Sequence, residues 1–122
     1  MSSAANGLGY VFLYVSDLER SRRFYGQALG WTETMQQGEV VGFRFGGLQL
    51  VIHADNRTQG KGEYGGGVWL ALEVPDVDAM HRELTGRGVT VTPVHDQHWG
   101  ERMFYFSDPD GFHWSCGSQK SR

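Results

Sequence analysis

The sequence predicts an α+β fold in which two βαβββ modules lie in tandem and form curled mixed sheets around a cleft. An internal repeat, its periodicity and its turn residues support this prediction. GYVFLYVSDLERSRRFYGQALGW, at residues 9–31, is matched by GVWLALEVPDVDAMHRELTGRGV, at residues 67–89. Each copy reads as an apolar strand, an acidic turn, an amphipathic helix and a glycine stop. Because 122 residues suffice for one core but not for two typical domains, we expect one domain, residues 1–122.

The first module, about residues 9–54, opens with an alternating strand at 9–15. Its aliphatic residues fall on one face and its aromatic residues, Tyr10, Phe12 and Tyr14, on the other. Ser16 or Asp17 can cap the following helix, whose apolar stripe suits the aliphatic face. The aromatic face is then left for a cavity.

Three short strands should complete this module, at residues 31–35, 40–45 and 48–53. Alternation along the last of them places His53 on the aromatic side of the sheet. Residues 55–66 are rich in glycine and polar groups and lack apolar periodicity, which is typical of a linker.

The second module, about residues 67–117, repeats this order. We expect a strand at 68–74, a helix at 77–87 and strands at 89–94, 102–107 and 112–117. DPDG, at 108–111, predicts a tight turn because proline fixes φ and glycine accepts positive φ. The face that corresponds to the aromatic face of the first module carries Trp69, Ala71, Glu73, Met103, Tyr105, Ser107, His113 and Ser115.

Composition excludes several classes of function. The chain is 39% hydrophobic and 20% charged, with a net charge of −3, which disfavours a nucleic-acid or anionic-membrane partner. The longest apolar run is far shorter than the roughly 20 residues that span a bilayer, and no signal peptide is recognisable at the start. With Cys116 as the single cysteine, nothing indicates an oxidising compartment, so we expect a cytoplasmic protein.

The duplicated module, with VSDLERSRRFYGQALGW at its start and WGERMFYFSDPDG near its end, resembles the vicinal oxygen chelate superfamily. That superfamily includes glyoxalase I, extradiol dioxygenases, fosfomycin-modifying enzymes and bleomycin resistance proteins. The resemblance covers residues 9–117 and is strongest, around 99–108, to antibiotic-binding and glyoxalase-like members. It implies a homodimer, whose lobes pair either within a chain or by exchange between chains.

In the enzymes of this superfamily, a divalent metal is held near the start of each module's first strand and on its last strand. By resemblance these positions fall at Tyr10, His53, Trp69 and Ser115. Only His53 is a good ligand, because neutral tyrosine and serine are poor donors and indole has no lone pair to give. We therefore expect no metal and no cofactor. His95 and His98 are the alternative source of metal ligands.

The sequence thus favours a metal-free protein that binds a hydrophobic or planar aromatic small molecule, as antibiotic-sequestering relatives do. A lyase, isomerase or cyclase is the alternative, with His53 as general base and Tyr105, Glu73 or His113 as the acid or oxyanion donor. A third possibility is a structural or regulatory dimer. No catalytic residue is assigned under the leading hypothesis. Its candidate ligand-binding residues are Tyr10, Phe12, Tyr14, His53, Trp69, Glu73, Trp99, Met103, Tyr105 and Ser115.

Overall fold

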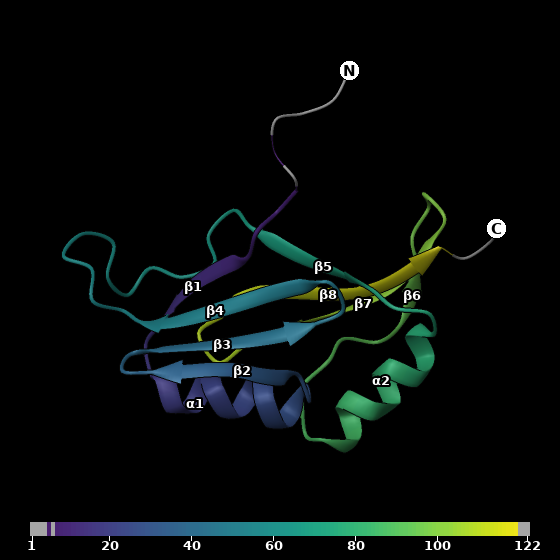
Figure 1. Cartoon of the computed structure of the whole chain (residues 1–122). Coiled ribbons are helices and arrows are strands. Elements are labelled where there is room, and N and C mark those ends of the chain that lie inside the picture. Colours follow the sequence, from purple (N-terminus) through teal and green to yellow (C-terminus); the bar gives the residue numbers. More distant parts are fainter. Residues whose placement is uncertain (1–4, 6, 120–122) are drawn as a thin grey trace. The chain divides into compact units, whose positions relative to one another are not determined.

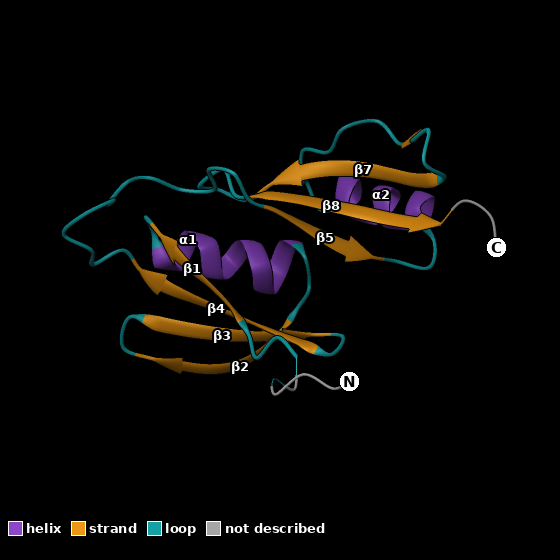
Figure 2. Cartoon of the chain, turned by 90° about the horizontal axis from the view of Figure 1, so that it is seen from above, coloured by secondary structure: helices purple, strands orange, loops and turns teal. Residues whose placement is uncertain are grey.

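The computed structural model describes residue 5 and residues 7–119. The chain divides into two compact units, Met1–Gly62 and Glu63–Arg122. Each unit contains one four-stranded mixed sheet with a helical segment packed on it (Figures 1 and 2). The two tandem βαβββ modules predicted from the repeat are therefore present.

The first sheet has the strand order β1-β4-β3-β2. β1 pairs in parallel with β4, and the other pairs are antiparallel. The elements of this unit are β1 (Val11–Val15), α1 (Leu18–Arg23), a π-helical turn η1 (Phe24–Ala28), β2 (Thr32–Gln37), β3 (Val40–Phe45) and β4 (Leu48–Ala54).

One face of the first sheet is covered by α1 and η1. The Asp17 side chain caps α1 by accepting a hydrogen bond from Arg20 N at 3.1 Å. Tyr25 then packs against Phe43, with 6.0 Å between ring centroids, and both residues are fully buried. The aliphatic residues of β1 and β4 lie on this face, as the alternation predicts: Leu13, Val15, Leu50 and Ile52.

The π-helical turn was not expected from the sequence. Leu29 N donates to Phe24 O at 2.9 Å, a bond that spans five residues instead of four. The wider turn keeps Tyr25 and Leu29 together against the sheet, and both are buried. Gly26 allows this close approach, because a Cβ there would lie 3.3 Å from the Phe43 ring.

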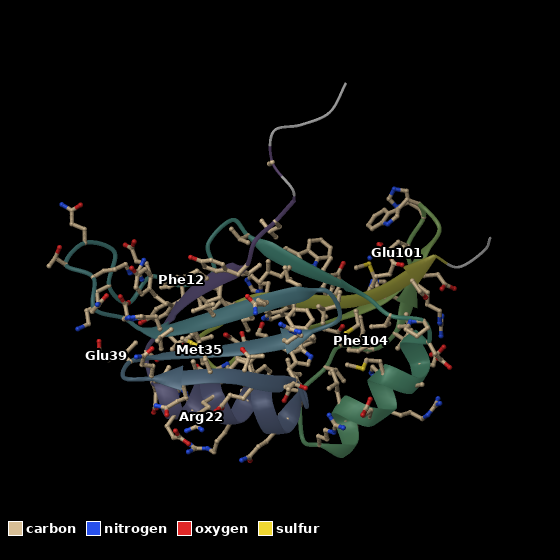
Figure 3. The ribbon with its side chains drawn as sticks, viewed as in Figure 1. Phe12, Arg22, Met35, Glu39, Glu101 and Phe104 are labelled. Carbon is tan, nitrogen blue, oxygen red and sulfur yellow. The ribbon has the colours of Figure 1, made fainter. Side chains whose placement is uncertain are left out.

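The second sheet repeats the topology, with the order β5-β8-β7-β6. Asp76 caps its helix as Asp17 caps the first, and the two caps have nearly the same backbone angles, φ −139° and ψ 100° against φ −138° and ψ 101°. Phe104 points toward this helix, where its ring meets His81 with 5.0 Å between centroids (Figure 3). The elements are β5 (Trp69–Glu73), α2 (Val77–Gly86), β6 (His95–Asp96), β7 (Glu101–Ser107) and β8 (His113–Gln119).

The strand predicted at 89–94 is reduced to a single bridge between Val91 and Phe106, and β6 begins only at His95. Tyr105 N donates to the Thr92 hydroxyl at 2.8 Å rather than to the Thr92 carbonyl. That carbonyl lies 3.0 Å from His81 Nε2 instead, and Pro93 has no N–H to donate. Along this edge the regular ladder is thus replaced by side-chain bonds and by one backbone bond, from Thr92 N to Tyr105 O at 2.9 Å.

The predicted turn at 108–111 is confirmed. The buried Asp108 carboxylate accepts hydrogen bonds from Asp110 N and Phe112 N, each at 2.9 Å. Gly111 has φ +90°, a conformation that side-chain-bearing residues rarely adopt. The turn holds the end of β7 next to the start of β8. The site described below lies at this end of the sheet.

Cys116 lies fully buried in β8, and burial raises the pKa of its thiol to about 12. Because the thiolate is the reactive form, the native protein should not react with Ellman's reagent at pH 8. The same protein in denaturant should release one equivalent of thionitrobenzoate per chain. Rapid reaction of the native protein would contradict the burial of this residue.

Within the described residues, none of the helices is long and apolar enough to cross a membrane.

Candidate functional site

The face of the second sheet that α2 does not cover, here called the second open face, holds a mixed aromatic and polar surface. Cross-strand pairing places residues of β5, β8 and β7 in three rows. The rows are Trp69, His113 and Ser107; Ala71, Ser115 and Tyr105; and Glu73, Gly117 and Met103.

Trp69 and Tyr105 form the centre of this surface. Their ring centroids are 4.9 Å apart and the rings are tilted by 58°. Trp69 is 48% exposed although it is a large apolar residue in a strand, so one face of the indole is left available. The pair thus presents exposed aromatic surface.

A pocket of about 640 Å³ opens beside these two rings, within the size range of small-molecule sites. It lies where β5 and β8 begin and β7 ends, next to the segment that replaces the missing strand. The pocket is lined by Trp69, Thr90, Val91, Thr92, Tyr105, Phe106, Ser107, His113 and Trp114.

A chain of polar side chains surrounds the Tyr105 hydroxyl. Gln97 Nε2 lies 3.2 Å from Tyr105 Oη and 2.8 Å from His95 Nε2. The His95 ring also stacks on the Tyr105 ring, with 5.7 Å between centroids. The Tyr105 hydroxyl itself lies 3.6 Å from Met103 Sδ. These contacts hold Tyr105 in one orientation beside the pocket.

Three other predicted site residues lie on the second open face with different accessibility. Met103 and Ser115 are almost completely buried, at 1% exposure each, whereas Glu73 is exposed at the end of β5. Among the described residues, Ser115 Oγ has no hydrogen-bond partner. A buried hydroxyl without a hydrogen-bond partner is costly.

Trp99 lies apart from the pocket lining, before β7. Its indole N–H donates to Glu101 Oε1 at 3.1 Å, and its ring meets His98 edge-on. The side chain is 52% exposed. The sequence did not distinguish Trp69 from Trp99 as the ligand-contacting residue. In the structure, Trp69 lines the pocket and Trp99 does not.

The uncovered face of the first sheet carries its own aromatic group. Phe12, Tyr14 and His53 contact one another, with centroid separations of 5.0 to 6.1 Å. Figure 3 shows Phe12 on the uncovered side of this sheet, whereas Arg22 lies on α1, on the covered side. Arg57 covers the Tyr14 ring at 4.5 Å and is held by the buried Asp55 carboxylate. Tyr10 precedes β1 and is exposed.

His53 has a defined tautomer. Its Nδ1 lies 2.7 Å from the carbonyl oxygen of Ala54, which can only accept, so Nδ1 carries the proton. In the neutral ring, Nε2 then carries no proton and is able to accept a hydrogen bond or a proton. This arrangement would suit a general base or a ligand contact.

The residues at the superfamily's metal positions do not fit a metal. Parallel pairing sets Phe12 opposite Val51 in the first sheet and Ala71 opposite Ser115 in the second. Val51 is therefore the counterpart of Ser115, and His53 lies two residues further along. Among the described residues, no three His, Cys, Asp or Glu side chains are grouped as metal ligands. His95, the alternative ligand, instead contacts Gln97 and Tyr105.

Sequence reasoning missed Gln97, Arg57 and residues 90–92. Gln97 lies in HDQHWG, which has no periodicity to show that its amide meets Tyr105. Arg57 lies in the predicted linker, and only the pair Asp55 and Arg57 hinted at local order.

Comparison with known proteins agrees with this architecture. A family model described as the Glyoxalase/Bleomycin resistance protein/Dioxygenase superfamily matches residues 7–115. A protein of that description from Nocardioides has a crystal structure that superposes with a TM-score of 0.82 at 25% identity, over 97% of this chain and 86% of that chain. A lactoylglutathione lyase from Agrobacterium tumefaciens gives 0.75 at 21% identity, over 97% of each, and shows the fold alone.

Curated relatives match only part of the chain. Uncharacterised proteins of Mycobacterium bovis and Mycobacterium tuberculosis are 45% identical over 51 residues, or 41% of this chain. The chain spans about a third of the length of these relatives, 34% and 30% respectively. The superfamily match extends over nearly the whole sequence, and the chain belongs to the Glyoxalase/Bleomycin resistance protein/Dioxygenase superfamily.

Proposed function

We propose that this protein binds and sequesters a hydrophobic, planar aromatic small molecule without a metal, and so protects against a cytotoxic natural product such as an antibiotic. The observation that carries the proposal is the half-exposed Trp69 beside Tyr105 at a pocket of about 640 Å³. The position that a chelating relative gives to a metal ligand is here given to an indole.

The energies are consistent with a deep apolar site rather than with stacking alone. Two aromatic contacts contribute about 1 to 3 kcal/mol beyond burial, whereas micromolar affinity corresponds to about 8 kcal/mol. Burial of about 300 Å² of apolar surface adds about 7.5 kcal/mol, before the cost of association is subtracted. A polycyclic ligand large enough to fill much of the pocket is therefore the expected class.

The alternative is a metal-independent lyase, isomerase or cyclase with His53 as general base. The contact of His53 Nδ1 with the Ala54 carbonyl oxygen, which leaves Nε2 to accept a proton in the neutral ring, is the observation that favours it. Under the sequestration hypothesis, His53 at most forms a hydrogen bond with the ligand and takes part in no reaction.

His53→Ala distinguishes the two functions. For a sequestering protein, equilibrium dialysis with a polycyclic aromatic probe should give a dissociation constant within about twofold of the parent protein. For an enzyme, turnover should fall by about 10² to 10⁴, the usual contribution of a general base. The matched control is His98→Ala. This variant alters an exposed histidine that lies outside the pocket and outside the group formed by Phe12, Tyr14 and His53. A collapse of turnover in His53→Ala alone would overturn the sequestration proposal.

We also propose that the protein acts in the cytoplasm as a homodimer. The exposed aromatic and aliphatic side chains of Tyr10, Phe12 and Val68, at 55%, 41% and 55%, support this proposal as surface that a partner copy could cover. Light scattering of the purified protein should give twice the 13.7 kDa chain mass, and a monomer mass would contradict this assignment.

A further inference from the structure

When the His95 ring is neutral, the hydrogen bonds around Tyr105 have one consistent set of directions. His95 Nδ1 lies 3.2 Å from the carbonyl oxygen of Pro93, which can only accept, so Nδ1 of the neutral ring carries the proton. His95 Nε2 must then be an acceptor. Gln97 has to present its NH₂ group to that nitrogen, at 2.8 Å, so the geometry fixes the orientation of the amide.

The second hydrogen of the Gln97 amide points to Tyr105. Gln97 Nε2 donates to Tyr105 Oη at 3.2 Å, and the Tyr105 oxygen is therefore used as an acceptor. The phenolic hydrogen is left to donate. Within the described part of the chain, its recorded partner is the thioether of Met103, at 3.6 Å, and sulfur of this kind is a weak acceptor.

A second hydroxyl on the same face, that of Ser115, also lacks a strong hydrogen-bond acceptor as its partner. Ser115 is directly opposite Tyr105 in the β7–β8 ladder, so the two side chains leave the sheet on one side. Ser115 Oγ is buried and has no hydrogen-bond partner among the residues described. The Tyr105 hydroxyl is therefore a donor whose recorded protein partner is a thioether, and Ser115 Oγ is a buried hydroxyl on the same face without a recorded partner.

From these contacts we infer that the site selects a planar aromatic ligand with a carbonyl-type oxygen, such as a quinone or aryl ketone, which accepts a hydrogen bond from Tyr105. The inference rests on the proposed binding function and specifies its ligand class. His95 and Gln97 are positioning residues, because they act through the direction in which they set the Tyr105 hydroxyl. Trp69, next to Tyr105, supplies the stacking surface for the ring system.

The test compares two probes that differ only in their carbonyl oxygens: anthraquinone-2-sulfonate and anthracene-2-sulfonate. Equilibrium dialysis against the full-length protein measures both dissociation constants. The parent protein should bind the quinone about fivefold more tightly than anthracene, the effect of one hydrogen bond to a buried carbonyl. Tyr105→Phe keeps the ring and removes the hydroxyl, so it should abolish that preference and leave anthracene binding within about twofold.

Gln97→Glu tests the positioning role with an almost isosteric change. A carboxylate can only accept, so the Tyr105 hydroxyl would donate to residue 97 instead of to the ligand. The preference for the quinone should again disappear while anthracene binding persists. Gln36→Glu makes the same charge change at an exposed position of β2 and should keep the preference.

The outcomes separate this inference from the proposed function. If the parent protein binds both probes equally, or if Tyr105→Phe or Gln97→Glu retains the preference, the assigned hydrogen bond is wrong while sequestration stands. If the parent protein binds neither probe, both the inference and the proposed function are overturned. Loss of the preference in both variants, with the control unchanged, supports the inference.

Discussion

Trp69→Ala is expected to weaken the binding of planar aromatic compounds about 30-fold. The change removes an indole that is 48% exposed at the mouth of the pocket and lies 4.9 Å from Tyr105. The lost stacking is worth about 0.5 to 1.5 kcal/mol, and the lost apolar burial adds about 1 kcal/mol. Together these amount to about 2 kcal/mol. Equilibrium dialysis with anthracene-2-sulfonate measures the change.

Trp99→Ala is the matched control for this prediction. It removes the same side chain from a position that is 52% exposed and outside the pocket lining. Its indole N–H is already used by Glu101. The dissociation constant should change by less than about threefold. If both variants lose the same affinity, or if Trp99→Ala loses more, Trp69 is not the residue on which the ligand stacks.

Trp114→Ala is expected to lower the free energy of unfolding by about 4 kcal/mol. Trp114 is 2% exposed, its ring lies parallel to that of Phe106 with 6.4 Å between centroids, and it forms part of the pocket wall. Removal of a buried tryptophan loses its transfer free energy and leaves a cavity that the sheet cannot close. Against a typical total of about 5 to 15 kcal/mol, this change endangers folding itself.

Urea denaturation followed by circular dichroism measures this effect. Trp114→Phe retains most of the buried volume and should cost about 1 to 2 kcal/mol, so it keeps the comparison measurable if the alanine variant fails to fold. Trp99→Ala should stay within about 0.5 kcal/mol of the parent protein because its side chain is exposed. An unchanged midpoint for Trp114→Ala would contradict the burial of this residue.

The internal repeat predicted the topology because both copies carry strong local signals. Asp17, one of the two expected cap residues, caps the first helix, and strand alternation placed Trp69 and Tyr105 on the same face. These features depend on residues close in sequence, and their period is visible without knowledge of tertiary contacts.

Other features depend on contacts between distant residues, so the sequence did not predict them. In the strand expected at 89–94, Thr92 bonds Tyr105 through both its side-chain hydroxyl and its backbone N–H instead of through a regular ladder. The burial of Met103 and Ser115 follows from packing, which alternation does not report. Register decided that Val51 rather than His53 is the counterpart of Ser115. The polar chain through Gln97 joins a loop to β7 and has no sequence pattern of its own.

If the protein holds its ligand in an aromatic pocket instead of at a metal centre, that ligand should quench the tryptophans of the pocket. Tryptophan fluorescence of the parent protein, titrated with a panel of polycyclic aromatic compounds, tests it most directly because Trp69 and Trp114 both line the pocket. At least one compound should give saturable quenching, with a dissociation constant of about 1 to 10 μM. The absence of saturable quenching by every compound of the panel would contradict it.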